Sequence, residues 1–283
     1  MVRNFLIVSL LGVVFALTPS WVGATQPDFD SAGNPLGAHQ PAAPANGDDR
    51  ALGDVLNSFP EPPDAAFGLT FRNGNLWGAG EGSLVLSEMN PDTGAVISTV
   101  TVNGAGFSNV AGLGYDTSRN LFIVTDTVID TVSTVDPTTG AVQNSWPAPA
   151  GGPVGASYDS VRDGYWICDF SSTLLYLVSP TDGAVVWTCP SLPAGSSTIA
   201  GVGYEAATDR LVYNSRSNGT TYIIEASDCS LVASFPTPGA WGNGVTVRPS
   251  DETIYLRDWA NHLIVVVDSD GLLPVELQSL AVE

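Results

Sequence analysis

The feature that most constrains this chain is a repeat of 43 to 46 residues, which recurs between Gly53 and Asp268. Each copy contains a glycine inside a short apolar segment: FGLTF around Gly68, AGLGY around Gly112, VGASY around Gly155, AGVGY around Gly201 and NGVTV around Gly244. A fixed period of this length indicates a solenoid or a closed ring, in which one small supersecondary unit is used repeatedly.

Each copy of the repeat predicts four short strands. The second strands follow the glycines by about ten residues: LWGAG from Leu76, LFIVTD from Leu121, YWICD from Tyr165, LVYNS from Leu211 and IYLRD from Ile254. A third strand follows, and then a turn with a fourth strand: NPDTGAVISTV from Asn90, DPTTGAVQNSW from Asp136, SPTDGAVVWTC from Ser179 and EASDCSLVASF from Glu225. Proline fixes φ in such a turn and glycine takes a positive φ, while the alternation that follows fits a half-exposed outer strand.

Four strands in 40–50 residues are typical of a β-propeller blade, so we predict an all-β, five-bladed β-propeller of four-stranded blades. The segment GDVLNSF, from Gly53 to Phe59, matches the fourth-strand pattern but has no first three strands before it. We expect it to complete the last blade, whose own strands run from Gly244 to Asp268, so that an N-terminal strand closes the ring and removes an open sheet edge. The alternative is that Leu272 to Val282 supplies this strand.

The ends of the chain are expected to lie outside the propeller. Arg3, the apolar run from Phe5 to Leu17 and the small residues Val22-Gly23-Ala24 predict a signal peptide over residues 1–24. Residues 25–50, rich in Ala, Pro, Gly, Asn and Asp, predict a disordered leader. The propeller is assigned to residues 51–271 and a C-terminal tail to residues 272–283, and the protein is expected to be secreted, extracellular or periplasmic.

The chain is strongly acidic, with 29 acidic residues, 9 basic residues and a formal charge of −20. An acidic surface repels phosphate backbones and anionic lipid, so we expect neither a nucleic-acid partner nor membrane insertion. Carboxylates are the ligands that Ca²⁺ prefers, which makes Ca²⁺ the cofactor that this charge favours. The alternative is that the charge serves only to keep the protein soluble.

Three cysteines are present, Cys168, Cys189 and Cys229. In an exported chain they are compatible with one disulfide and one buried thiol, or with three buried thiols. None has the C-x-x-C spacing of a zinc site.

With the blades aligned, the chain resembles the YVTN/NHL-type group of secreted bacterial β-propellers. The resemblance covers Gly53 to Asp268 and rests on the D-P-x-x-G-x-V turn and on Val124-Thr125-Asp126, which is similar to the V-T-N strand end of that group. Cys168-Asp169, Asn214-Ser215 and Arg257-Asp258 depart from this pattern in other blades. The resemblance implies a binding or surface protein, and related propellers include lactonases, a streptogramin lyase and glutaminyl cyclotransferases.

Polar residues at the ends of the second strands are the first candidates for a site. Our alignment places Gly80, Thr125, Asp169, Ser215 and Asp258 at equivalent positions, with Asp126, Phe170, Arg216 and Trp259 one step beyond. Asp126, Asp169 and Asp258, with Asn214 nearby, are therefore expected to converge on one face and form the oxygen-ligand set of a Ca²⁺ site. The alternative is that each aspartate caps its own turn by accepting backbone N–H groups.

Aromatic residues are the second set of candidates. Trp77, Phe122, Trp166 and Tyr255 align at the centres of second strands, which predicts packing between blades. Trp241, in a loop that also carries Asn243, and Trp259 break this pattern. An indole beside Asp and Asn suits the binding of a sugar or a peptide, although packing under a loop is the alternative. Arg72, Arg119, Arg162 and Arg210 recur near the first hairpin, which predicts a structural role.

We therefore expect a binding module that recognises a small molecule, glycan or protein through its channel face, without catalysis. The alternative is a metal-dependent propeller enzyme, similar to a lactonase or a glutaminyl cyclotransferase. Only Glu81 lies near a lactonase-like ligand position, and of the two histidines His39 lies in the leader and His262 in a turn. A histidine base of the lyase type and a nucleophilic triad therefore have little support.

Overall fold

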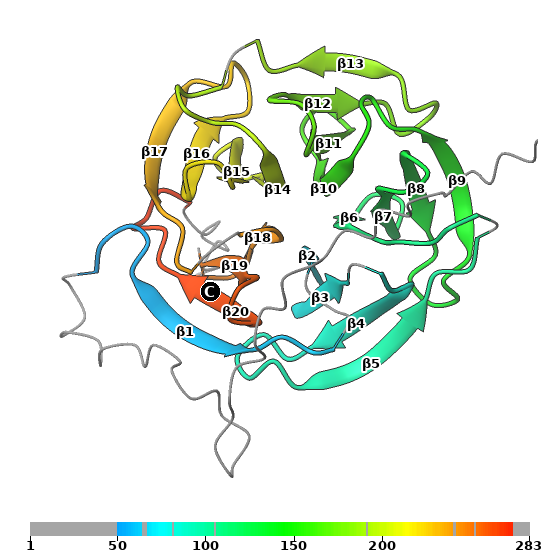
Figure 1. Ribbon diagram of the computed structural model, residues 1–283, viewed down its shortest axis with the longest axis horizontal. Helices are drawn as coiled ribbons and strands as arrows, with labels where there is room; N and C mark the ends of the chain where they lie inside the picture. The colour runs from blue at the N-terminus through cyan, green and yellow to red at the C-terminus, as the bar shows by residue number, and fades with distance from the viewer. Residues whose placement is uncertain are drawn as a thin grey trace, which may run out of the picture.

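The computed structural model describes residues 50–63, 67–80, 82–104, 106–190, 192–239, 242–251 and 253–273. These residues form five four-stranded antiparallel sheets arranged around a central axis, which confirms the predicted five-bladed β-propeller (Figure 1). Within them no helix has the length and apolar character needed to cross a membrane. The predicted signal peptide, nearly all of the leader and most of the tail lie outside the described residues.

Each blade runs from an innermost strand beside the axis to an outermost strand at the rim. Blade 1 contains β2 (Gly68–Arg72), β3 (Asn75–Ala79), β4 (Val85–Met89) and β5 (Val96–Thr101). Blade 2 contains β6 (Gly112–Asp116), β7 (Leu121–Asp126), β8 (Thr131–Val135) and β9 (Val142–Pro147). Blade 3 contains β10 (Pro153–Asp159), β11 (Gly164–Asp169), β12 (Leu175–Val178) and β13 (Val185–Thr188). Blade 4 contains β14 (Ile199–Glu205), β15 (Arg210–Ser215), β16 (Thr220–Glu225) and β17 (Leu231–Pro236). Blade 5 contains β18 (Val245–Val247), β19 (Ile254–Asp258), β20 (Leu263–Val267) and β1 (Val55–Pro60).

The N-terminal strand closes the ring, as predicted. Strand β1 pairs antiparallel with β20 and forms the outer edge of blade 5, where the blue strand lies beside the orange-red one in Figure 1. The Gly53 N–H also donates to the Asp268 carbonyl at 2.9 Å. The first two residues of the predicted tail pack on the propeller, since Leu273 is buried and the Leu272 carbonyl accepts a hydrogen bond from Arg210.

In blades 1 to 4 the repeated glycine of the innermost strand lies where neighbouring blades are in contact. A Cβ on Gly68 would lie 2.3 Å from the Leu113 amide nitrogen, and one on Gly201 would lie 2.2 Å from the Asn243 carbonyl oxygen. Five blades converging on one axis bring adjacent inner backbones together at this level. Glycine recurs because no side chain fits between them.

Large apolar side chains fill the space between blades farther from the axis. Trp77, Phe122, Trp166 and Tyr255 are all at most 2% exposed, which confirms their predicted packing role. The ring centroids of Trp77 in blade 1 and Phe122 in blade 2 are 4.8 Å apart. Each second strand therefore contributes to the core that holds its blade to a neighbour.

The turns before the outermost strands have the predicted chemistry. Gly94, Gly140 and Gly183 adopt φ values of 70°, 72° and 70°. The carboxylate of Asp136 accepts the N–H groups of Thr138 and Thr139, and these bonds lower its pKa. In blade 4 the glycine position is occupied by Cys229, which has a φ of 62°.

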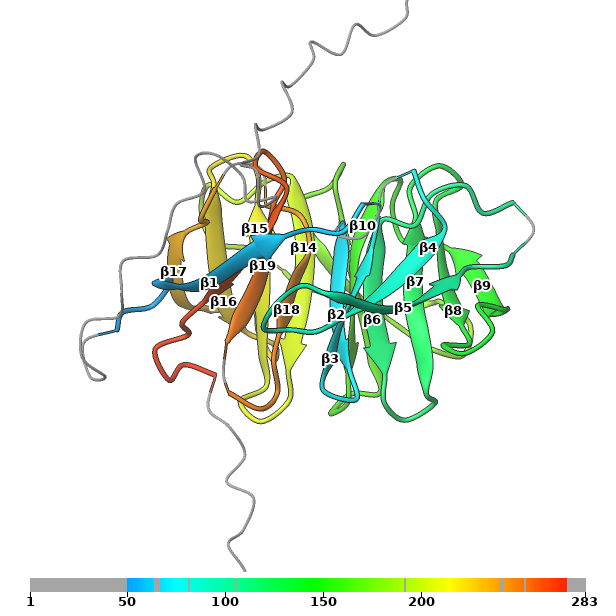
Figure 2. The same ribbon diagram turned by 90° about the horizontal axis from the view of Figure 1, so that it is seen from below.

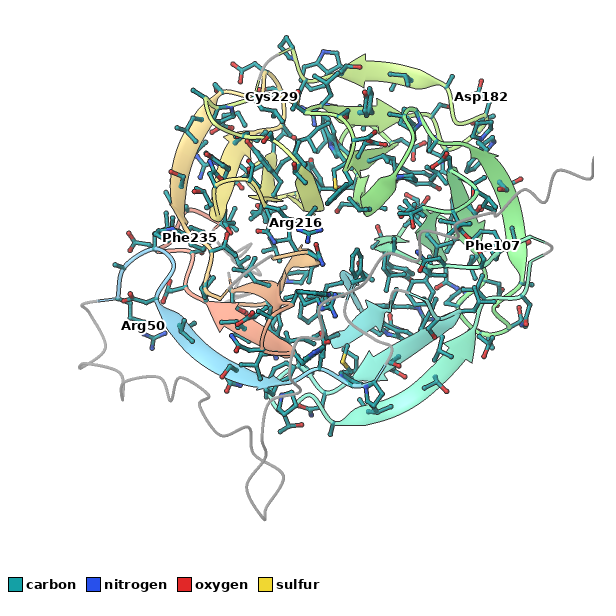
Figure 3. All side chains as sticks on the ribbon, viewed as in Figure 1. Arg50, Phe107, Asp182, Arg216, Cys229 and Phe235 are labelled. Atoms are coloured by element: carbon teal, nitrogen blue, oxygen red, sulfur yellow. A yellow bond between two sulfur atoms is a disulfide. The ribbon has the colours of Figure 1, made fainter. Side chains whose placement is uncertain are left out.

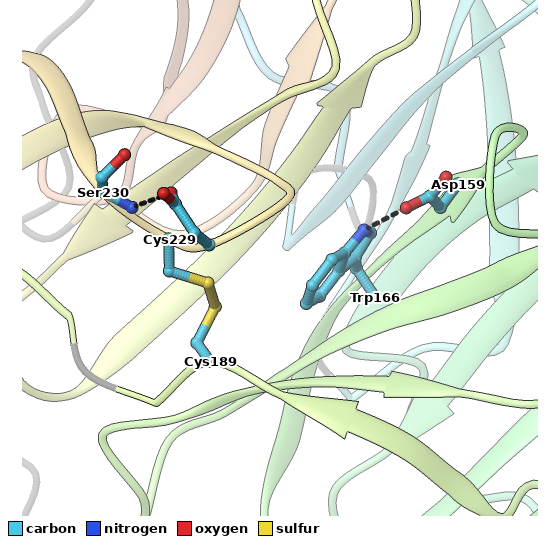
Figure 4. The surroundings of a disulfide bond; sticks show 6 residues. Asp159, Trp166, Cys189, Cys229 and Ser230 are labelled. Atoms are coloured by element: carbon cyan, nitrogen blue, oxygen red, sulfur yellow. Dashed lines mark hydrogen bonds between the residues drawn. A yellow bond between two sulfur atoms is a disulfide. The ribbon is translucent and has the colours of Figure 1, made fainter.

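This exceptional cysteine forms a disulfide. Cys229 of blade 4 is bonded to Cys189, which follows the last strand of blade 3 (Figure 4). The third cysteine, Cys168, is a buried thiol whose pKa is raised by burial. Of the two alternatives left by the sequence, one bridge with one buried thiol is therefore the one found.

Arginines of the first hairpins link consecutive blades. Arg119 of blade 2 binds Asp163 of blade 3 through two N–H groups, each at 2.7 Å. Arg162 of blade 3 binds Asp209 of blade 4 in the same manner, at 2.6 and 2.7 Å. The predicted structural role is thus confirmed for these residues. Arg210 differs, since its carboxylate partner is Glu225 of its own blade.

Candidate functional site

The two faces of the ring carry different loops. What we name the entry face carries the loops that lead from the outermost strand of one blade into the innermost strand of the next, together with the hairpins between second and third strands. The opposite face carries the hairpins between first and second strands and the turns before the outermost strands (Figure 2). Those residues predicted to form the site that the structure describes lie toward the entry face, because they end or follow second strands or belong to an entry loop.

The observed register corrects our alignment of the second strands. Gly112 pairs with Thr125 and Gly155 pairs with Cys168, so Asp126 is equivalent to Asp169. The equivalent residues in the five blades are Gly80, Asp126, Asp169, Ser215 and Asp258. The predicted equivalence of Thr125 is wrong, because Thr125 is the residue that pairs with Gly112 and Asp126 follows it. The signal was present in the sequence: each of the three aspartates follows its repeat glycine by 14 residues.

Asp126 ties an entry loop to a hairpin. One carboxylate oxygen accepts the N–H groups of Ser108 and Asn109, at 2.9 and 3.1 Å. The other accepts the N–H groups of Val128 and Ile129, at 2.8 and 3.2 Å. The side chain is fully buried. All four bonds come from the backbone, so Asp126 fits the turn-capping alternative.

Asp169 and Asp258 cap their hairpins in a related way. Asp169 accepts the N–H groups of Ser171 and Ser172 through Oδ1, and Asp258 accepts those of Ala260 and Asn261. Asp169 differs in one respect, because its buried Oδ2 has no hydrogen-bond partner.

The aspartates do not fit one shared Ca²⁺. The described residues contain no group of three or more His, Cys, Asp or Glu side chains placed to hold a metal ion. Both oxygens of Asp126 already accept two backbone N–H groups, and Asn261 occupies Oδ2 of Asp258 at 2.6 Å. The predicted convergence of Asp126, Asp169 and Asp258 is therefore not found among these residues, and we derive no chemistry through a metal.

The two predicted asparagines have different roles. Asn214 is buried and satisfied, since its Nδ2 donates to the Asn243 carbonyl at 3.0 Å and its Oδ1 accepts from Thr221 at 2.9 Å. The side chain of Asn243 is also buried, with 1% exposure, but neither its Oδ1 nor its Nδ2 has a hydrogen-bond partner. Asn214 therefore supports the loop that carries Asn243.

Asn243 is the one polar residue among the five that directly precede the repeat glycines. The residue before the repeat glycine is Phe67, Ala111, Val154, Ala200 or Asn243 in the five blades, and all five are buried. Phe67, Ala111 and Val154 belong to one hydrophobic cluster although they come from three blades. Contact between them places this layer near the axis, on the entry side. Blade 5 contributes an unsatisfied amide to a layer that is otherwise apolar.

The residue that directly follows the capping position has a different side chain in each blade. Thr127, Phe170, Arg216 and Trp259 occupy this position in blades 2 to 5. Arg216 lies with its Cζ 5.0 Å from the ring centroid of Phe170, so it reaches from blade 4 to blade 3, and it points toward the middle of the ring (Figure 3). Phe170 is 43% exposed. Trp241 and Glu81 lie outside the described residues.

An ion pair at the closure of the ring was missed by the sequence analysis. Arg257 donates to both oxygens of Glu61 at 2.6 and 2.8 Å, and both side chains are 9% exposed. The Nδ1 of His262 lies 2.8 Å from the same carboxylate, so this histidine is not simply solvated as its position in a turn predicted. Glu61 lies outside the repeat and 196 residues from Arg257, so the pattern gave no signal for the pair.

Comparison with known proteins supports the architecture alone. No family model and no curated protein matches the sequence. Among solved structures, the fold is similar to that of Myxococcus xanthus glutaminyl cyclase, with a TM-score of 0.62 and 16% identity over 77% of this chain and 96% of that one. The virginiamycin B lyase of Staphylococcus aureus gives a TM-score of 0.48 and 13% identity over 74% of this chain and 68% of that one. The WD40 propeller domain of Doa1 gives a TM-score of 0.48 and 15% identity over 70% of this chain and 62% of that one.

Proposed function

We propose that the protein is a secreted propeller of the YVTN/NHL type that binds a ligand at its entry face without catalysis. The observation that carries this proposal is the Asn243 side chain, an amide near the axis that is 1% exposed and has no partner on either polar atom. A buried donor or acceptor without a partner costs about 1–3 kcal/mol. A ligand that supplies both partners removes this cost.

The chemistry of Asn243 favours a ligand that itself carries amide groups. Its side chain offers one acceptor and one donor pair, which complement the N–H and C=O of a peptide unit. Phe170 of blade 3 and Arg216 of blade 4 lie on the same face, where an exposed ring and a guanidinium suit side chains or a terminal carboxylate. A short peptide combines these features.

Two further observations support the cellular part of the proposal. The Cys189–Cys229 bridge is a structural disulfide, which is typical of proteins that leave the reducing cytosol. The formal charge of −20 disfavours nucleic acid and anionic membrane surfaces as partners. The disulfide agrees with a signal peptide over residues 1–24, and the charge agrees with a partner other than nucleic acid or a membrane.

The test uses Asn243→Leu, which keeps the size of the side chain and removes its polar atoms. A defined pool of tetrapeptides with free termini, including members that begin with glutamine, and a pool of oligosaccharides are titrated against the full chain. We expect peptides to bind, the variant to lose at least about tenfold in affinity, and its thermal stability to stay equal or rise, since an unsatisfied amide has been removed. Asn144→Leu, on the outer strand β9, is the control and keeps full affinity.

Three results would contradict the proposal. Unchanged peptide affinity in Asn243→Leu would show that the amide is not part of the site. Binding of oligosaccharides instead of peptides would overturn the ligand class. A change in mass of a bound peptide, including cyclisation of an N-terminal glutamine, would establish catalysis and favour the enzyme alternative.

A further inference from the structure

A cavity lies at the end of the ring opposite the entry face, where the innermost strands end. Its volume is about 200 Å³, below the roughly 300–1,000 Å³ of sites for drug-sized ligands. All five blades contribute to its lining, which includes Thr70, Tyr115, Tyr158, Tyr204, Glu205 and Thr246. The cavity therefore lies on the axis of the ring. Its volume suits a small molecule.

Aromatic side chains surround this cavity. The third residue after the repeat glycine is Phe71, Tyr115, Tyr158, Tyr204 and Val247 in the five blades, and all of them line it. The Tyr158 hydroxyl donates to Asp163 at 3.0 Å, and the Tyr204 hydroxyl donates to Asp209 at 3.0 Å. Burial raises the pKa of both phenols, so they stay neutral and keep fixed orientations at physiological pH.

Two of the lining hydroxyls are available to a ligand. Thr70 is 8% exposed and Thr246 is 7% exposed, and neither side chain has a hydrogen-bond partner among the described residues. They occupy the same position in adjacent blades, two residues after the repeat glycine. Their hydroxyls therefore provide polar contacts inside an aromatic wall.

In blade 4 the carboxylate of Glu205 lines this cavity and has no arginine partner of the kind found in blades 2 and 3. In blades 2 and 3 the last residue of the innermost strand, Asp116 or Asp159, accepts a hydrogen bond from the arginine three residues later. In blade 4 these positions hold Glu205 and Thr208, and Glu205 accepts from the backbone and hydroxyl of Thr208. No ion pair to Glu205 exists within the described part of the chain.

The surrounding hairpins add to this negative charge. Their described residues hold six carboxylates, those of Asp116, Asp159, Asp163, Glu205, Asp209 and Asp251. They hold five guanidinium groups, those of Arg72, Arg119, Arg162, Arg210 and Arg248. The six carboxylates outnumber the five guanidinium groups by one, so the net charge of these hairpins is negative and favours a cation over an anion.

We propose that this cavity binds a small organic ammonium ion, held by the tyrosine rings and the Glu205 carboxylate. Aromatic rings attract a cation through the negative charge on their faces, and quaternary ammonium groups are bound in this way in aromatic cages. Glu205 supplies the opposite charge, and Thr70 and Thr246 offer hydrogen bonds to a hydroxyl on the ligand. This site is separate from the one proposed on the entry face.

The test compares two molecules of nearly the same shape, choline and its neutral carbon isostere 3,3-dimethylbutan-1-ol. Each is titrated calorimetrically into the full chain at low ionic strength. We expect choline to bind and its isostere to bind at least about tenfold more weakly, because only choline gains from the rings and the carboxylate. Glu205→Gln keeps the size of the side chain and is expected to reduce the preference for choline, because only the attraction of the rings then remains.

Glu88→Gln is the matched control. It removes the same charge from blade 1, where Glu88 bonds to Asn75 and Ser98 outside the cavity, and it is expected to leave choline binding unchanged. Equal affinities of the two molecules would overturn the ammonium assignment in favour of a neutral ligand. No heat from either molecule, or full choline affinity in Glu205→Gln, would overturn the site. Loss of entry-face binding in Asn243→Leu tests the other site separately.

Discussion

At the scale of single residues, the repeated glycine of the innermost strand in blades 1 to 4 allows neighbouring blades to approach closely at the axis. Gly201 does not adopt a positive φ, so its freedom of conformation is not the reason for its presence. Its importance comes from contact, since any Cβ there would lie 2.2 Å from the Asn243 carbonyl oxygen. That oxygen belongs to the backbone of an adjacent blade and cannot rotate away.

Gly201→Ala is therefore expected to destabilise the protein by about 1–3 kcal/mol through overpacking. Gly151→Ala is the control, because the nearest atom to its Cβ, an oxygen of Asp130, would be 3.6 Å away. Denaturant unfolding followed by intrinsic fluorescence measures both. Equal free energies of unfolding for the two variants would show that neighbouring blades separate easily at the axis.

The turn-capping aspartates lead to a second residue-scale prediction. Asp126→Asn replaces one acceptor oxygen with an NH₂ group that faces the N–H donors of either Ser108 and Asn109 or Val128 and Ile129. The buried donors then lose their acceptor, so we expect a loss of about 1–3 kcal/mol in the free energy of unfolding.

Addition of Ca²⁺ to the wild-type protein is expected to leave its melting temperature unchanged, because these oxygens are engaged. Differential scanning calorimetry with chelator and with Ca²⁺ measures both effects. A Ca²⁺-dependent rise in melting temperature that Asp126→Asn abolishes would restore the metal prediction made from the sequence.

At the scale of elements, the turn before the outermost strand shows how a repeat tolerates an exception. Three blades fill the positive-φ position of this turn with glycine, and blade 4 fills it with Cys229. A residue with a Cβ is strained there by roughly 1–2 kcal/mol. The disulfide to Cys189 spans 40 residues, for which chain-entropy arguments give a stabilisation of about 4 kcal/mol. The bridge outweighs the strain.

Removal of the bridge separates these two effects. Cys189→Ala/Cys229→Ala loses the crosslink and keeps the strain, whereas Cys189→Ala/Cys229→Gly loses the crosslink and restores the turn residue of the other blades. We expect both to be less stable than the wild-type protein, with the glycine variant the more stable of the two by about 1 kcal/mol. Urea unfolding under non-reducing conditions measures the difference, and an alanine variant as stable as the glycine variant would contradict the assigned strain.

The sequence patterns within one repeat predicted the strands and turns well, because strands and turns depend on local chemistry. The D-P-x-x-G turn and the glycine-centred strand predicted the strands, and the unmatched segment from Gly53 to Phe59 predicted the closing strand. The site was predicted less well. Asp126 was recognised, but its register depends on pairing with a strand earlier in the chain. The unsatisfied state of Asn243 and the pair between Glu61 and Arg257 depend on tertiary contacts that no local pattern encodes.

At the scale of the whole molecule, the ring is fastened on both faces by charged groups. Glu61 and Arg257 fasten the closure toward the entry face. On the opposite face Arg162 joins blades 3 and 4 through Asp209, and Arg248 of blade 5 reaches Asp92 of blade 1 at 2.9 Å. These pairs use a large share of the few cations in a chain with a formal charge of −20. The cohesion of the ring therefore depends on its carboxylates remaining ionised.

The final prediction concerns the response of the ring to acid. The hydrogen bonds from Arg119 and Arg162 lower the pKa of Asp163 and of Asp209 below the ordinary value of 3.8. An unfolded chain then binds more protons than the folded one around pH 4, so stability falls as pH falls through this range. Above the ordinary value both states are ionised and the contribution of these pairs is fully present. We expect a melting temperature that is nearly constant from pH 8 to about 5 and declines below about pH 4.

Asp209→Asn tests the origin of this decline, because it removes one of the two carboxylates bound by Arg162. The variant is expected to melt at a lower temperature at pH 7 and to approach the wild-type protein as the pH falls, since protonation removes the same interaction from the wild type. Asp270→Asn removes an equal charge from an exposed residue and is expected to follow the wild-type profile throughout. Calorimetric melting temperatures across this range measure all three proteins. A constant offset between Asp209→Asn and the wild type down to pH 2.5 would show that the acid response arises elsewhere, because the link between blades 3 and 4 would then not depend on the ionisation of Asp209.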